Sequence, residues 1–123
     1  MRQKRPQTRL PSEEQTNKFD LCKPMLESLF REMKELSKKA PDGRLNTVKV
    51  KMINRVLADV KTALSDEPTM AYLDLLEDET LPSNSDVVLI LGQYTAAAHQ
   101  FEREYQKHDP LLGVTRWSTV ENP

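Results

Sequence analysis

Glycine is scarce in this chain. Its three glycines, Gly43, Gly92 and Gly113, are widely separated in the sequence. Dinucleotide-binding and phosphate-binding loops each need glycines within a few residues of one another, because backbone amides must approach the phosphate closely. Both motifs are therefore excluded, and the shortage of turn-forming glycine also argues against an all-β fold.

Cysteine is nearly absent as well. Cys22 is the only one, which excludes an intrachain disulfide and a thiolate-rich zinc site. A single thiol suits a reducing compartment. We expect Cys22 to be a small buried core residue, because free cysteine is among the most buried residue types.

Long apolar runs are missing. The longest, residues 87–91, has five residues, against the ~20 that a membrane span requires. The basic start of the chain is not followed by the apolar region of a secretory signal. We therefore expect a cytoplasmic protein with no membrane partner.

Groups that commonly carry catalysis are few. The histidines are His99 and His108, and on one helix they would face opposite sides and could not share a metal. No nucleophile elbow is present, and no histidine lies near Cys22 in the sequence. The acids of residues 74–79 are interpreted as a solvated loop. These absences predict a protein that is not an enzyme and that uses no metal, cofactor or small-molecule substrate.

What the sequence does contain is helical periodicity. Ser12 and Gln15 form a capping-box pattern, and we expect a helix from there to near Lys39, with a break at Pro24. The apolar stripe of this helix, at alternating spacings of three and four, is Phe19, Cys22, Leu26, Leu29, Met33 and Leu36.

A second helix is predicted from Asn46 or Thr47 to Leu64. Residues 47–53 leave an alternative open, because the alternation of residues 48–52 also fits an edge strand. The helical period continues to Leu64 without interruption, which favours the helix.

Two more helices are expected further along the chain. A short one follows Asp66 and Pro68 and reaches about Glu77, and a long one covers residues 84–108, capped by Asn84 or Ser85.

These elements define the expected organisation. The fold class is all-α: a small helical bundle of three long helices plus one short helix, covering residues 12–108. A mobile basic N-terminal arm (residues 1–11) precedes it and an irregular C-terminal tail (residues 109–123) follows it. Since only 37% of the residues are apolar, the core is expected to be thin.

Charge is distributed unevenly. Residues 1–61 carry 15 Lys and Arg against 8 acids, whereas residues 62–102 carry 8 acids and no Lys or Arg. Three interpretations stay open. Antiparallel second and fourth helices could fold the halves against each other, the basic half could track nucleic-acid phosphates, or it could dock on an acidic partner or a second copy. The candidate nucleic-acid-binding residues are Arg2, Lys4, Arg5, Arg9, Lys49, Lys51 and Arg55.

A short motif lies at the end of the last predicted helix. Arg103 and His108 form an Arg-x4-His pattern. In these six residues and in its all-α outline, the chain resembles the HEPN family of helical-bundle ribonucleases, in which two such motifs meet across a dimer to cleave RNA. The resemblance implies a ribonuclease site at Arg103 and His108, although Glu104 departs from the small polar residue usual after the arginine.

Aromatic and apolar residues near the C-terminal end are the candidates for protein contact. An aromatic residue in a polar tail often anchors a partner pocket, but the tail could equally fold back into a groove of its own bundle. The favoured function is a non-enzymatic interaction module that binds a protein partner or a second copy, and a nucleic-acid-binding accessory subunit is the alternative. The candidate partner-binding residues are Tyr94, Phe101, Tyr105, Leu111, Leu112 and Trp117.

Overall fold

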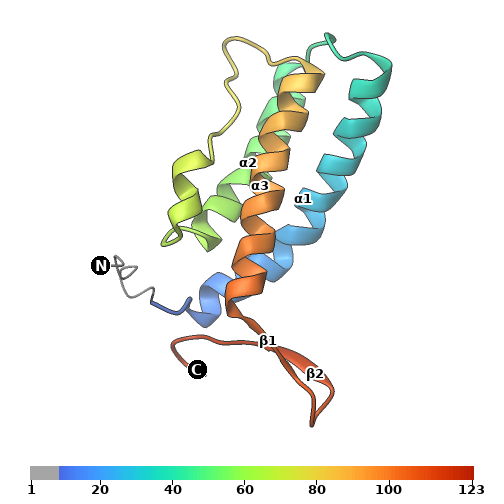
Figure 1. The fold of residues 1–123 in the computed structure, drawn as a ribbon. Helices are drawn as coiled ribbons and strands as arrows, with labels where there is room; N and C mark the ends of the chain where they lie inside the picture. The colour runs from blue at the N-terminus through green and yellow to red at the C-terminus, as the bar shows by residue number, and fades with distance from the viewer. Residues whose placement is uncertain (1–8) are drawn as a thin grey trace, which may run out of the picture.

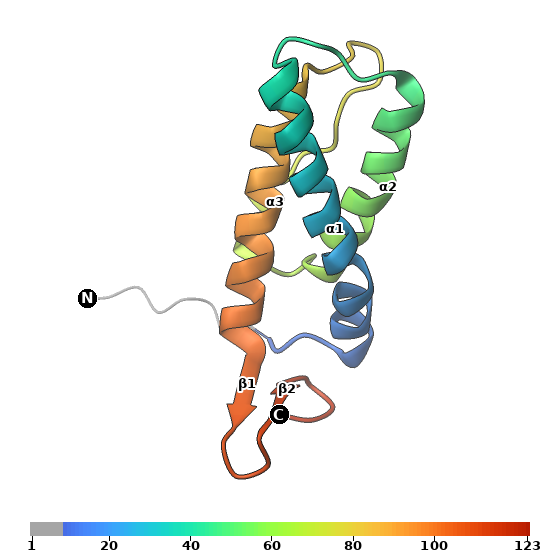
Figure 2. The same cartoon turned by 90° about the vertical axis from the view of Figure 1, so that its right-hand side faces the viewer.

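The computed structural model describes residues 9–123, which are mostly helical and end in a small two-stranded sheet (Figure 1). Helix α1 runs in one direction, and α2 and α3 both return in the other (Figures 1 and 2). None of the helices in this part of the chain is long and apolar enough to cross a membrane. The elements are α1 (Glu13–Lys39), α2 (Thr47–Ala63), the 3₁₀ helix η1 (Pro68–Tyr72), α3 (Asn84–Tyr105), β1 (Gln106–Asp109) and β2 (Val114–Trp117).

Helix α1 begins at the predicted capping box. The Ser12 side chain accepts from the Gln15 amide, and the Gln15 side chain accepts from the Ser12 amide. The helix ends at Lys39 as predicted, but the expected break at Pro24 is wrong, because α1 continues through it. Buried Phe19 and Leu26 hold the two flanking turns on the core, so packing offsets the hydrogen bond that proline cannot make.

Helix α2 confirms the helical interpretation of residues 47–53. Asn46 caps it by accepting from the Lys49 amide. Val50, Ile53 and Leu57 are buried at helical spacing, and the alternation that fits a strand places Val48 and Met52 in solvent. Burial over the whole stripe therefore decides the local structure.

The short third helix begins near Pro68 as predicted, but it is a 3₁₀ helix and ends at Tyr72 instead of near Glu77. Only η1 is helical there, and residues 73–78 are irregular. Asn54 of α2 donates from its amide nitrogen to the Leu76 carbonyl and accepts from the Leu76 amide, both at 2.8 Å. This side chain satisfies the backbone of Leu76 in place of a helical turn.

Residues 64–83 connect α2 to α3 in the sequence. Helix α1 packs along both of them, whereas α2 and α3 have few direct contacts. Leu64, Leu73 and Leu76, at and beyond the end of α2, are buried in the same core. Antiparallel packing of the second and last long helices, on which one of the three interpretations of the charge rested, is wrong, because the two helices run in the same direction (Figure 1).

The last helix is shorter than predicted. Ser83 caps α3, one or two residues before the expected cap, and the helix ends at Tyr105 instead of His108. The expected irregular tail forms a β-hairpin in which β1 pairs antiparallel with β2. Its turn closes at Gly113, whose φ of 66° lies in the left-handed region that favours glycine.

The start of the described chain packs on the helical body (α1, α2, η1, α3 and their connections). Leu10 packs against the core and Pro11 is buried. The Pro11 carbonyl accepts from the Val120 amide at 3.0 Å. The arm expected at residues 1–11 therefore does not include these two residues, and its first eight residues lie outside the described part of the chain.

Candidate functional site

The hairpin tip carries an exposed apolar group. Leu111 is 95% exposed, more than any other large hydrophobic side chain in the described part of the chain, and Leu112 is 73% exposed. Exposed Val114 adjoins them on β2. Figures 1 and 2 show the hairpin projecting beyond one end of the helical body. We call Leu111, Leu112 and Val114 the hairpin tip.

The base of the hairpin is held by Trp117. Its ring centroid lies 5.4 Å from that of Phe19 and 5.5 Å from that of Phe101. The indole nitrogen donates to the Asp20 carboxylate at 3.1 Å. The Trp117 side chain is therefore half-buried in a groove of its own chain, which is the second of the two arrangements that the sequence left open.

Three of the predicted partner-binding residues belong to the core. Tyr94, Phe101 and Tyr105 are each at most 2% exposed, so they offer no surface to a partner. Their helical spacing along α3 is the signal of a core stripe. Burial and, less strongly, the charge of Asp74 raise the pKa of Tyr94, whose hydroxyl donates to the Asp74 carbonyl at 2.8 Å.

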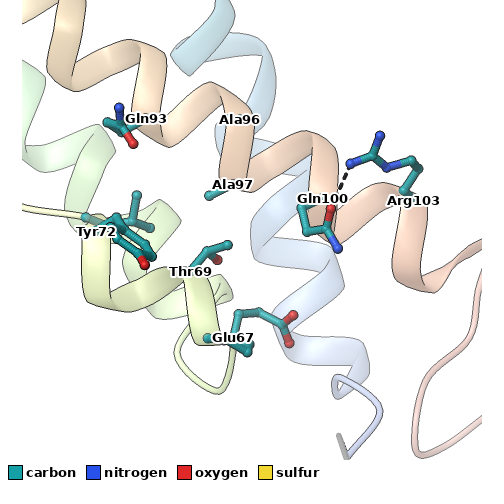
Figure 3. Close-up of a pocket in the computed structure, with 10 residues that line it drawn as sticks. Glu67, Thr69, Tyr72, Gln93, Ala96, Ala97, Gln100 and Arg103 are labelled. Carbon is teal, nitrogen blue, oxygen red and sulfur yellow. Dashed lines mark hydrogen bonds between the residues drawn. The ribbon is translucent and has the colours of Figure 1, made fainter. Parts of the chain in front are cut away.

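A cavity of about 490 Å³ lies between η1 and α3 (Figure 3). Tyr72 and Thr69 of η1 face α3, where Ala97 and Gln100 line the opposite wall. Buried Glu67 borders it and accepts from the Tyr105 hydroxyl at 3.0 Å. No pattern in the sequence indicates this cavity. Its lining residues lie far apart in the chain, on η1 and on α3, and only the fold brings them together.

The two histidines share one cleft. His99, His108 and Arg103 line a cleft of about 530 Å³ between the end of α3 and the hairpin. The expectation that the histidines face opposite sides is wrong, because α3 ends at Tyr105 and His108 lies on β1. The Arg103–His108 pattern thus spans a helix and a strand, and the ribonuclease activity that the resemblance implies stays a prediction.

The predicted basic residues are only partly neutralised. Arg2, Lys4 and Arg5 lie outside the described residues, and Arg9 pairs with Asp66 at 3.8 Å. Lys49, Lys51 and Arg55 are exposed on α2 and make no ion pair within the described part of the chain.

A small apolar groove, of about 250 Å³, separates α1 from α2. Leu29, Met33 and Met52 contribute to it, and Glu32 and Lys49 lie at its edge. Leu29 and Met33 belong to the predicted apolar stripe of the first helix, and nothing in the sequence indicates a groove at these positions.

Cys22 is buried, as predicted. Burial, together with the nearby charge of Asp59, raises the pKa of its thiol to about 11. A thiol that stays protonated at neutral pH is a poor nucleophile and a poor metal ligand. Residues 9–123 contain no cluster of three His, Cys, Asp or Glu side chains that could hold a metal ion.

No protein-family model matches this chain, and neither curated proteins nor solved structures give a significant match. The function is therefore inferred from the surfaces just described. Among them, the hairpin tip contains Leu111, the most exposed large apolar side chain in the described part of the chain.

Proposed function

We propose that this chain is a non-enzymatic interaction module, a small bundle of three long helices and one short helix that docks on a protein partner through its hairpin tip. The exposure of Leu111 and Leu112 carries this proposal. Burying one leucine side chain contributes roughly 1.5–3 kcal/mol, and neither of these two receives that contribution within its own fold.

The rigidity of the hairpin supports docking. The Asp109 carboxylate accepts from the amides of Leu111 and Leu112, at 3.0 and 3.3 Å. The Gly113 amide donates to the Asp109 carbonyl at 2.8 Å. A turn that is already ordered loses less conformational entropy on binding than a flexible loop does.

The stem of the hairpin indicates the chemistry of the partner. Lys107 and Arg116 lie directly opposite each other across the two strands, an arrangement that is unfavourable for like charges. Their side chains donate to carbonyl oxygens, Lys107 to that of Glu104 and Arg116 to those of Trp117 and Asn122. A partner with an apolar pocket and an acidic rim would complement both the tip and this stem.

Site-specific photo-crosslinking tests the proposal. A photoreactive residue at Leu112 is compared with one at Val48, which is 66% exposed on α2 and so provides a matched control. In cells that naturally express the protein, we expect a discrete crosslinked species from position 112 and none from position 48. Equal crosslinking from both positions would contradict the proposal.

A nucleic-acid-binding accessory subunit is the second candidate function. The supporting observation is that Lys49, Lys51 and Arg55 are exposed on one helix without acidic partners in the described residues. Mobility shifts with RNA and DNA at low salt test it. A shift that is lost when all three are replaced by glutamine supports this function, and no shift at low salt removes it.

A further inference from the structure

The cleft between α3 and the hairpin gathers nitrogen-bearing side chains from two elements. His99 and Arg103 are one turn apart on the same face of α3. His108 and Thr115 are directly opposite each other in the strand pairing. All four line the cleft, which has a volume of about 530 Å³. Because α3 ends at Tyr105, His108 lies on β1 and lines the same cleft as His99 and Arg103 of α3.

The balance of charge in this cleft favours a negative ligand. Glu102 is the one acidic residue that lines it. The Glu102 carboxylate forms an ion pair with Lys23 of α1, and both side chains are about three-quarters buried. Lys23 therefore neutralises the charge that would otherwise repel an anion.

Arg103 keeps its charge available. Its guanidinium donates to the neutral side-chain oxygen of Gln100 at 2.7 Å, which orients the group without cancelling its charge. Figure 3 shows this hydrogen bond between two side chains of α3 that also line the cavity between η1 and α3. An oriented guanidinium binds the oxygens of a phosphate in pairs, and a protonated histidine adds a further charged donor.

We propose that the cleft formed by His99, Arg103 and His108 binds a phosphate group. The Arg103 guanidinium contacts two phosphate oxygens, and the two histidine rings and the Thr115 hydroxyl supply further donors. The phosphate can belong to a free monoester or to the backbone of single-stranded RNA, and the same four side chains recognise either one. This inference does not depend on the proposed docking by the hairpin tip.

Titration of the full-length protein tests the inference. The ring signals of both histidines are followed by NMR as inorganic phosphate or a short single-stranded RNA is added at constant pH and ionic strength. We expect saturable shifts of both rings with at least one of the two ligands. Saturation with phosphate points to a monoester, and saturation with RNA alone points to a nucleic-acid backbone.

Variants separate the site from general electrostatics. Arg103→Gln is expected to weaken binding by about tenfold or more, and Arg103→Lys to retain part of the affinity, because lysine keeps the charge but loses the paired donors. Arg31→Gln removes the same charge from an exposed position on α1 that belongs to no proposed site, and it should leave the affinity unchanged. Absence of saturable shifts, unchanged binding by Arg103→Gln, or equal weakening by Arg31→Gln would overturn the inference. Circular dichroism confirms that each variant is folded.

Discussion

The indole ring of Trp117 stands edge-on to the ring of Phe19, with 5.4 Å between the ring centroids and 82° between the ring planes. The two residues are 98 positions apart in the sequence. Phe101 of α3 packs against both rings, so the contact ties the hairpin to both α1 and α3. The result is a hairpin whose base belongs to the core while its tip lies in water.

Replacing Trp117 by alanine should destabilise the protein by about 2–3 kcal/mol, because it removes a half-buried aromatic ring and its edge-to-face contacts. Urea unfolding followed by circular dichroism measures the loss. Trp117→Phe keeps an aromatic ring in the groove and should recover about half of it. A loss below about 0.5 kcal/mol for the alanine variant would show that the hairpin is not anchored as described.

The two hydrogen bonds between the Asn54 side chain and the backbone of Leu76 form a clamp that should stabilise the folded protein. Asn54→Ala leaves the amide and carbonyl of Leu76 without their partners, at a cost of about 1–3 kcal/mol. The Leu76 amide should also exchange with solvent much faster. Asn54→Asp keeps the acceptor for the Leu76 amide and should preserve its protection better than alanine does. Identical exchange in all three proteins would contradict the clamp.

The thiol of Cys22 predicts a dependence of stability on pH. The folded pKa of about 11 lies above the ordinary value of 9.0. The group therefore contributes fully below about pH 9, and its contribution is lost as the pH rises through about 11. Cys22→Ala should flatten the decline in unfolding free energy between these values. An unchanged slope would contradict the assignment of this decline to Cys22.

Self-association is tested by light scattering coupled to size-exclusion chromatography. If the acidic residues 62–102 of one copy bind the basic residues 1–61 of another, the measured mass of the protein should exceed that of a monomer at low salt. It should fall toward the monomer mass at high salt. A dimer held by the hairpin tip should instead persist at high salt and disappear in the Leu111→Ser/Leu112→Ser variant. A strict monomer at both salt concentrations removes a second copy as the partner.

Local sequence patterns correctly predicted the two ends of α1 and the position of α2. The Ser12–Gln15 capping box and the basic turn ending at Lys39 marked both ends of α1, and the stripe to Leu64 identified α2. The end of α3 could not be found in this way, because residues 106–108 leave the helix to pair with residues 115–117, and no local pattern indicates that pairing. Tertiary pairing overrides local propensity in such segments.

The candidate sites also divide into residues whose surroundings local patterns indicate and residues whose surroundings depend on the tertiary structure. Leu111 and Leu112 are exposed, whereas the sequence left open whether the tail packs on its own bundle or stays free for a partner. Tyr94 was misassigned as a contact residue although its spacing on α3 indicated the core. His99 and His108 line one cleft because α3 ends at Tyr105. The sequence predicted a longer helix, and this error also hid the cleft.

The double variant Leu111→Ser/Leu112→Ser tests the central claim most directly, with Val48→Ser as the control. Its unfolding free energy and the partner species crosslinked from a photoreactive residue at Val114 are measured together in both variants. We predict that stability changes by less than about 0.5 kcal/mol in the double variant, while the crosslinked species is lost there and retained in the control. Crosslinking that survives in the double variant would contradict docking through the hairpin tip.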